Sequence, residues 1–217
     1  MASTSLTLQD HALAAAKAAI NFVPVVGGPI ASLVSDYVPT YQQRAQAEAC
    51  EALNQKLASL STRIDSDAVN KADFADLYLK YQATISRTTR REKLTAAANI
   101  LANMLLKPGD SAKSSYEELD HMLGLVDRLS VGAITALGAA RKVTTSPGER
   151  NRFHFQPLQS MLPGWDQDFL LSCVMELSSA HLLTVQTGAI NTTDFNGLIN
   201  ITPLGLRFAS KFIEGSM

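Results

Sequence analysis

The chain has 217 residues, of which 46% are hydrophobic and 18% charged, and its formal net charge is −1. This composition is typical of one large domain or two small ones with a packed core, and it argues against a long disordered chain. The near-neutral balance excludes a general electrostatic attraction to nucleic acid. Abundant alanine and leucine, with only 6% aromatic residues, favour helices over sheet.

The two cysteines lie far apart in the sequence, in apolar helical surroundings. We expect Cys50 and Cys173 to be buried thiols rather than a disulfide, as is usual in a reducing cytosol. The N-terminus shows neither a basic segment nor a signal-cleavage pattern, so a cytoplasmic protein is expected.

The most apolar stretch spans residues 12–34 and is long enough for a helix that crosses a bilayer. Four helix-breaking residues interrupt its middle: Pro24, Gly27, Gly28 and Pro29. The stretch therefore predicts an apolar helical hairpin over residues 10–38, with a tight turn between its two helices. The first helix runs from about Asp10 to Phe22, and the second begins at Pro29 because proline is favoured at the first helical position.

Two interpretations of this hairpin stay open. Its helices are either core elements of an N-terminal bundle, or they leave the bundle to insert into a membrane or to self-associate. Closely spaced glycine and alanine favour tight contacts between helices in lipid, whereas one lysine inside the bilayer costs a few kcal/mol. The residues that matter most to the second interpretation are Lys17, Phe22, Pro24, Gly27, Gly28 and Pro29.

The rest of the N-terminal half also predicts helices. Pro39 is expected to end one helix, and a long helix follows from about Tyr41 to Ile64. Its packing seam consists of residues spaced by three and four: Cys50, Leu53, Leu57, Leu60 and Ile64. Further helices are expected around residues 74–85 and 94–106, and residues 107–115 are the best candidate linker because they are rich in Pro, Gly and Ser. Residues 1–107 are therefore predicted to form a helical bundle that includes the hairpin.

The C-terminal half, residues 113–217, has a different pattern. Helices are expected at Tyr116–Leu129, Val131–Val143, Gln156–Leu162 and Trp165–Leu183, with Ser130 as the N-cap of the second. Two strands, Leu182–Gln186 and Leu198–Thr202, flank a polar hairpin tip, and a closing helix begins at Thr202 and Pro203. Helices, a two-stranded wing and a final helix predict a winged-helix domain. The overall expectation is a mainly α protein, with a helical bundle followed by a winged helix.

A DNA-reading domain of this kind presents basic or amide side chains from the helix before the wing. Here that helix carries Asp166, Asp168 and Glu176 but no Lys or Arg. From residue 113 onward eight basic residues stand against ten acidic ones, a net charge of −2. One basic group remains as a candidate contact for a phosphate or an acidic partner: Arg141, Lys142, Arg150 and Arg152. The alternative is that this group belongs to a solvated loop.

Catalytic signatures are missing from the sequence. The four histidines share no metal-ligand spacing with one another or with the cysteines, and no phosphate loop, dinucleotide fingerprint or nucleophile elbow occurs. The carboxylate pairs at 65 and 67 and at 166 and 168 are expected to cap helices or turns, because a carboxylate near a helix N-terminus is stabilised there. We therefore predict that the protein is not an enzyme and uses no cofactor and no metal.

Three segments resemble the bacterial abortive-infection alpha (Abi-alpha) family. The helix EKLTAAANILANML (Glu92–Leu105) is similar to that family's E-L-x-x-x-x-A-x-L-L-A-N pattern. The segment Tyr116–Ser130 begins Y-E-E-L and ends L-S, and I-T-P-L-G-L-R-F (Ile201–Phe208) is similar to L-T-x-x-G-x-x-F. The matches lie mostly beyond residue 90, and the apolar hairpin is not part of the pattern. The resemblance implies an intracellular role in bacterial defence against phage, without a mechanism or active-site residues.

These observations favour a non-enzymatic, abortive-infection-like defence effector. Its N-terminal hairpin would disturb a membrane or mediate assembly, and its winged helix would sense a partner protein. Two alternatives stay open: a DNA-binding regulator that contacts phosphate through the wing and Arg141–Arg152, and a scaffold or inhibitor that binds another protein. We expect a protein partner or self-association, and a cytoplasmic location with membrane association on activation. Nucleic acid is a possible partner that the acidic recognition helix disfavours.

Overall fold

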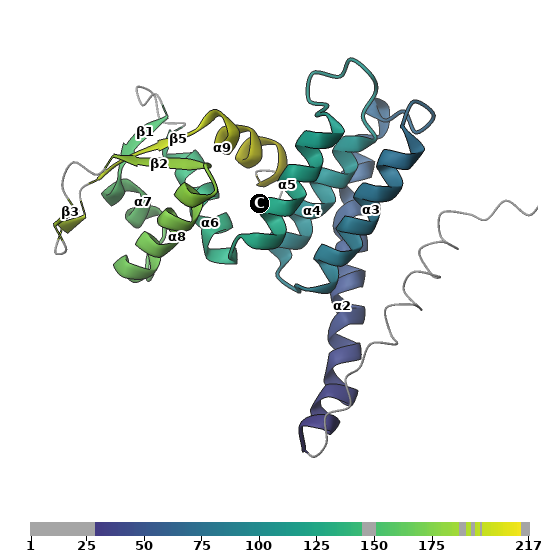
Figure 1. Cartoon of the computed structure of the whole chain (residues 1–217), viewed down its shortest axis with the longest axis horizontal. Helices are drawn as coiled ribbons and strands as arrows, with labels where there is room; N and C mark the ends of the chain where they lie inside the picture. Colours follow the sequence, from purple (N-terminus) through teal and green to yellow (C-terminus); the bar gives the residue numbers. More distant parts are fainter. Residues whose placement is uncertain (1–28, 145–150, 187–189, 192–193, 196, 214–217) are drawn as a thin grey trace, which may run out of the picture. The chain divides into compact units, whose positions relative to one another are not determined.

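The computed structural model describes residues 29–144, 151–186, 190–191, 194–195 and 197–213, with side chains given for 42–144, 151–186 and 197–213. The chain is mainly helical with a small antiparallel sheet (Figure 1). It divides into two compact units, Met1–Arg44 and Ala45–Met217. The helices are α2 (Pro29–Ser59), α3 (Lys71–Ser86), α4 (Arg91–Met104), α5 (Tyr116–Arg128), α6 (Val131–Thr144), α7 (Phe155–Met161), α8 (Gln167–Ser179) and α9 (Pro203–Phe208). Two short helical turns are η1 (Ser61–Arg63) and the π-helical η2 (Ala209–Ile213).

Helix α2 begins at Pro29, as predicted. It then continues through Pro39, where we expected an end, so that expectation is wrong. A proline removes one backbone donor and crowds the preceding turn, at a cost of about 3 kcal/mol. The assigned helix nevertheless runs without a break from Pro29 to Ser59. The remainder of the predicted hairpin, residues 10–28, lies outside the described residues.

Within the larger unit, α2 places Ala49, Leu53, Leu57 and Leu60 against the core. The predicted seam is therefore confirmed for its leucines and wrong for Cys50, which is exposed. The buried position is taken instead by Ala49, one residue earlier, which is fully buried. The hydroxyl of Tyr81 donates to the carbonyl of Ala49 at 3.2 Å and marks the same face.

Helix α4 occupies the centre of this unit and packs against α3, α5, α6 and η2. Every residue from Ala96 to Met104 is buried, so the helix has no wet face in this stretch. Its alanines let the neighbouring helices approach closely. One polar side chain inside the core is satisfied, because Asn99 donates from Nδ2 to the carbonyl of Phe212 at 2.9 Å.

The predicted linker, residues 107–115, forms a hydrogen-bonded turn. Asp110 accepts two hydrogen bonds from the guanidinium of Arg63, at 2.8 and 2.6 Å, and one from the backbone of Ala112. Asn103 holds the same turn by donating to the carbonyl of Ala112 and accepting from the N–H of Ser114, both at 2.8 Å. One core cluster includes side chains from both sides of this turn. The domain boundary that we placed here stays a prediction.

The sheet contains β1 (Arg152–His154), β5 (Leu198–Ile201) and β2 (Leu183–Gln186), in that order and all antiparallel. Thr184 and Arg152 both lie opposite Asn200, which places β5 in the middle. The predicted strands β2 and β5 are thus confirmed, whereas β1 was not foreseen. Between β2 and β5 in the chain, β3 (Ile190–Asn191) pairs with β4 (Asp194–Phe195).

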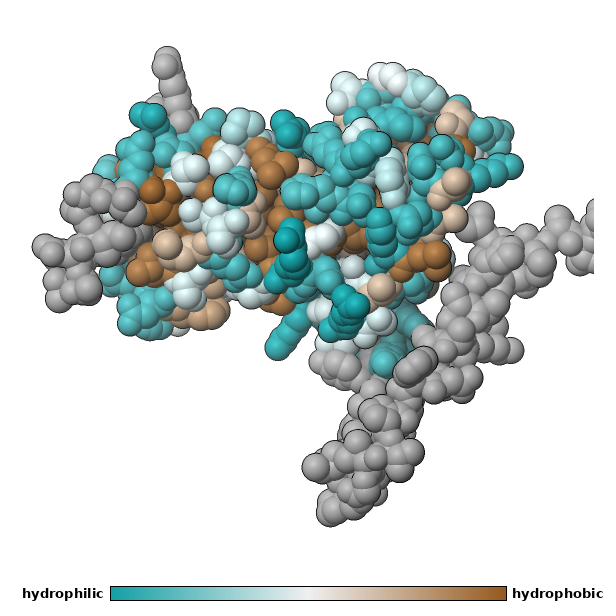
Figure 2. All heavy atoms as spheres, viewed as in Figure 1, coloured by the Kyte–Doolittle hydropathy of each residue, from teal (hydrophilic) through white to brown (hydrophobic). Residues whose placement is uncertain are grey.

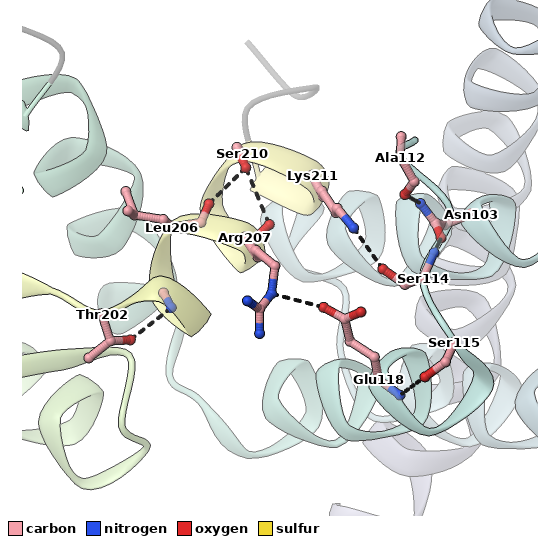
Figure 3. Close-up of polar contacts among 11 residues, drawn as sticks. Asn103, Ala112, Ser114, Ser115, Glu118, Thr202, Leu206, Arg207, Ser210 and Lys211 are labelled. Carbon is pink, nitrogen blue, oxygen red and sulfur yellow. Dashed lines mark hydrogen bonds and ion pairs between the residues drawn. The ribbon is translucent and has the colours of Figure 1, made fainter. Parts of the chain in front are cut away.

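The closing helix α9 begins as the sequence predicts, with Thr202 as N-cap and Pro203 in the first turn. The hydroxyl of Thr202 accepts a hydrogen bond from the N–H of Gly205 at 2.9 Å. Figure 3 shows how this end of the chain reaches the other helices. Arg207 donates to a carboxylate oxygen of Glu118 on α5 at 3.1 Å, and Lys211 donates to the hydroxyl of Ser114 at 2.8 Å.

Gly205 offers a direct test of this packing. A Cβ atom added there would lie 2.1 Å from the carbonyl oxygen of Leu182. Because that neighbour is backbone, we expect Gly205→Ala to lower the free energy of unfolding by about 3 kcal/mol or more in urea denaturation. The matched control is Gly124→Ala on α5, where nothing lies within 4 Å; it should be neutral or stabilise by up to about 1 kcal/mol. Equal effects of the two changes would contradict the packing described.

Asp110 offers a pH test. The hydrogen bonds from Arg63 and the Ala112 backbone lower the pKa of the Asp110 carboxyl to about 2, from an ordinary 3.8. A carboxyl whose pKa is lowered by folding stabilises the protein above its unfolded pKa and loses that effect as the pH falls toward the folded pKa. Asp110→Asn should therefore lower the melting temperature at pH 7, and its difference from the natural protein should shrink between pH 4 and 2. Asp67→Asn, on an exposed turn, serves as the control and should have little effect at either pH.

Candidate functional site

Helix α8 is the element whose exposed face merits a functional interpretation. Its inner side buries Leu170, Cys173, Val174 and Leu177 in the core. The helix packs closely on α6 at Gly132, where an added Cβ would lie 2.8 Å from the Sγ of Cys173. Burial raises the pKa of the Cys173 thiol, and this disfavours a nucleophilic role. The prediction that Cys173 is buried is confirmed.

A carboxylate on α8 fixes the rotation of the helix. Glu176 accepts from both the backbone N–H and the hydroxyl of Ser130, each at 2.6 Å. The Ser130 hydroxyl in turn accepts the N–H of Ala133 at 3.0 Å, so Ser130 caps α6 as predicted. A negative charge at a helix N-terminus is favourable. One of the three acidic residues of α8 and its flank is therefore used structurally.

The outward side of α8 carries apolar and acidic side chains. Phe169 is 50% exposed and Met175 is 49% exposed. The half-buried Trp165 packs against Phe169 with ring centroids 4.9 Å apart. We call the α8 surface the set that lines this side: Trp165, Asp168, Phe169, Ser172 and Met175. In Figure 2 hydrophobic residues reach the surface among hydrophilic ones in the region where Figure 1 draws α7 and α8.

The charged residues of α8 and of its neighbours in the sequence have one sign. Between Arg152 and Arg207 the sequence contains no lysine or arginine, and its acidic residues there are Asp166, Asp168, Glu176 and Asp194. Asp166 occupies the N-cap position of α8, yet its side chain makes no capping hydrogen bond. The capping role that we expected for this carboxylate is therefore wrong. Asp65, by contrast, accepts from the N–H groups of Asp67 and Ala68, as a turn-capping residue does.

The predicted basic group is divided among several elements. Arg141 and Lys142 lie in the last turn of α6, and Arg152 is exposed at the start of β1, a strand in contact with α6. Arg141 and Lys142 each already interact within the chain. Arg150 lies outside the described residues, as do Lys17, Phe22, Pro24, Gly27 and Gly28 of the predicted hairpin, whereas Pro29 starts α2.

A polar cluster joins α3 to α5. Lys80 lies 2.8 Å from Asp76 and 2.7 Å from Asp120, and the hydroxyl of Tyr116 donates to Asp76. Hydrogen bonds to Asp120 and Asp76 raise the pKa of Lys80, and the hydrogen bond to Asp76 raises the pKa of Tyr116. Both shifts lead away from neutrality, where a general acid or base works best. The cluster is suited to joining two helices rather than to proton transfer.

In the part of the chain that the structure describes, no group of three or more His, Cys, Asp or Glu side chains is arranged to hold a metal ion. Among the same residues no single helix has the length and apolarity to cross a membrane. Helices α5 and α6 meet those criteria only as a pair bent by 119°, and both contribute many side chains to the core.

Comparisons with protein-family models, with curated proteins and with solved structures find no match to this chain.

The α8 surface predicts poor affinity for nucleic acid. In fluorescence anisotropy with a labelled duplex at near-physiological salt, we expect no saturable binding up to about 10 µM, because nucleic-acid affinity depends on several cationic contacts. The contrary result is binding that weakens with salt and disappears on Arg152→Glu. This result would favour a DNA-binding regulator whose functional site lies on α6 and β1.

Proposed function

We propose that residues from α6 to α9 form a winged-helix domain. The order of elements supports this: α6, β1, α7, α8, β2 and β5, followed by α9. The strand order β1-β5-β2 brings the hairpin strands together with β1 on the far side of β5. In this arrangement α7 and α8 form the helix-turn-helix pair, and α8 is the helix that DNA-binding relatives of the fold insert into the major groove.

We propose further that this domain contacts a protein rather than DNA. The observation that carries the proposal is the α8 surface, where Phe169 and Met175 stand half exposed beside Asp168 and no cation is present on the helix. Aromatic residues and methionine are enriched in protein interfaces. A major groove bordered by phosphates offers no counterpart to an acidic, apolar helix face.

The proposed setting is bacterial defence of the abortive-infection type, as the resemblance to the Abi-alpha family implies. The residues that carry the resemblance have definite structural tasks. In I-T-P-L-G-L-R-F, Thr202 caps α9, Gly205 allows close approach to Leu182, and Phe208 is buried. In the ILAN segment of α4, Asn103 secures the turn that leads to α5. The residues of the family-like segments therefore have structural roles in this fold. The role in defence remains a proposal.

The effector end of the proposal is the N-terminal apolar segment. Helix α2 continues N-terminally beyond Ala45 as far as Pro29. The two residues before Pro29 in the sequence are Gly27 and Gly28. We propose that this segment inserts into a membrane or assembles with further copies when the C-terminal domain meets its partner. The proposed role requires no catalytic step, because insertion into the host membrane would itself damage the cell.

Expression in bacteria tests this proposal. We expect induced expression, or phage challenge of cells that carry the chain, to arrest growth and depolarise the membrane. A Gly27→Leu and Gly28→Leu double variant should reduce this killing by about tenfold, because bulky side chains block close helix contacts. Leu79→Ser, a change at a 63% exposed residue of α3, is the matched control and should kill normally.

Two results would contradict the effector role. The first is harmless expression with and without phage. The second is a purified protein that leaves dye-loaded liposomes intact and stays monomeric, both alone and in the presence of the liposomes. Harmless expression together with stable capture of a single protein would instead support the scaffold or inhibitor.

A further inference from the structure

The α8 surface combines two features that define what can cover it. It has large exposed apolar side chains, Phe169 and Met175, with Trp165 at one end. It also includes the carboxylate of Asp168, and a second carboxylate, of Asp166, lies beside it at the N-cap of the helix. Neither forms an ion pair with a cation in the described ranges. A helix N-terminus alone favours anions, but these two carboxylates turn this end of α8 into an acidic region.

We propose that the α8 surface is the docking site for a cationic amphipathic helix of a partner protein. Apolar residues of that helix, at spacings of three and four, would pack on Phe169 and Met175, and its lysines or arginines would pair with Asp166 and Asp168. This inference rests on the proposed protein-contact role of α8 and adds the chemistry of the partner. Methionine adapts to differently shaped apolar side chains, so one surface can accept such a helix without a preformed groove.

Charge decides against the occupants that the chain itself offers. The segment before α2, residues 1–28, contains one lysine and one aspartate, so it cannot neutralise two carboxylates and also retain a net positive charge. A second copy docking through the same surface would bring like charges together, which is unfavourable. A separate cationic helix satisfies both the apolar and the acidic part of the surface.

The chain carries its own reporter. Trp165 is the single tryptophan, and it lies half-buried at the edge of the surface. The probe is a tryptophan-free peptide of leucine and lysine, about 18 residues long, with leucines at helical spacing. Added to the full chain, it should shift the Trp165 emission to shorter wavelength in a saturable way. The expected dissociation constant is on the order of 10 µM, weakening at high salt.

Variants and control peptides locate the effect. Phe169→Ser with Met175→Ser should weaken binding by about tenfold, as expected for losing central apolar anchors. Asp168→Lys should weaken it by roughly threefold or more, because it sets like charges together. Leu79→Ser should bind as the natural chain does. Phe169→Ser could perturb the packing at Gly132, and in that case Met175→Ser alone and Asp168→Lys still test the surface. Melting followed by circular dichroism checks that each variant is folded.

Three outcomes would overturn the inference: no saturable shift of Trp165, equal binding of a peptide with glutamate in place of lysine, or equal binding of the same composition in scrambled order. A dimer in light scattering that dissociates on Met175→Ser would assign the surface to a second copy and would overturn it as well. The test is independent of killing. A chain that arrests cells without binding the peptide overturns only this inference, and a chain that binds the peptide without arresting cells overturns only the effector role.

Discussion

Helix α4 is enclosed on all sides between Ala96 and Met104, and the larger unit is organised around that constraint. A helix without a wet face needs small or apolar side chains and partners for its polar groups, and the alanines of α4 set how closely α3, α5, α6 and η2 can approach. The hydrogen bond from Asn99 to the carbonyl of Phe212 fixes where the closing turn meets this helix. Through that contact, and through the hydrogen bond from Arg207 to Glu118, α9 and η2 are held against α4 and α5. The position of the sheet and of α8 depends on the same core.

The exposed side of α8 is determined by the way the helix is held. Gly132 lets the helix lie close to α6, and the double hydrogen bond from Ser130 to Glu176 fixes its rotation. With the helix held in this way, Met175 is half exposed, and so is Phe169, whose ring lies against Gly132. Apolar side chains that adjoin one another at the surface, as Trp165 and Phe169 do, are typical of an interface.

Local signals in the sequence predicted the elements that local chemistry decides. Pro29 starts α2, Ser130 caps α6, and Thr202 with Pro203 starts α9, because each supplies an acceptor or a preset φ at a helix end. The features that failed depend on distant partners. The three residues of β1 are too few to produce a period, and their pairing with β5 defines them. The loop at 107–115 resembles a linker in composition, and only Arg63 and Asn103 reveal it as an ordered turn.

The same division applies to the candidate site. The absence of cations from α8 is visible in the sequence, and so is the acidic pair. The sequence does not show which apolar residues face outward. Phe169 and Leu170 are neighbouring hydrophobic residues, yet Phe169 is half exposed and Leu170 is buried.

The most direct measurement is site-specific photocrosslinking in bacteria, with a photoreactive residue at position 175 and, as control, at position 79. The account predicts crosslinks from position 175 to a cationic amphipathic helix of one protein, and none of these from position 79. Crosslinks to nucleic acid, or the same products from both positions, would contradict it.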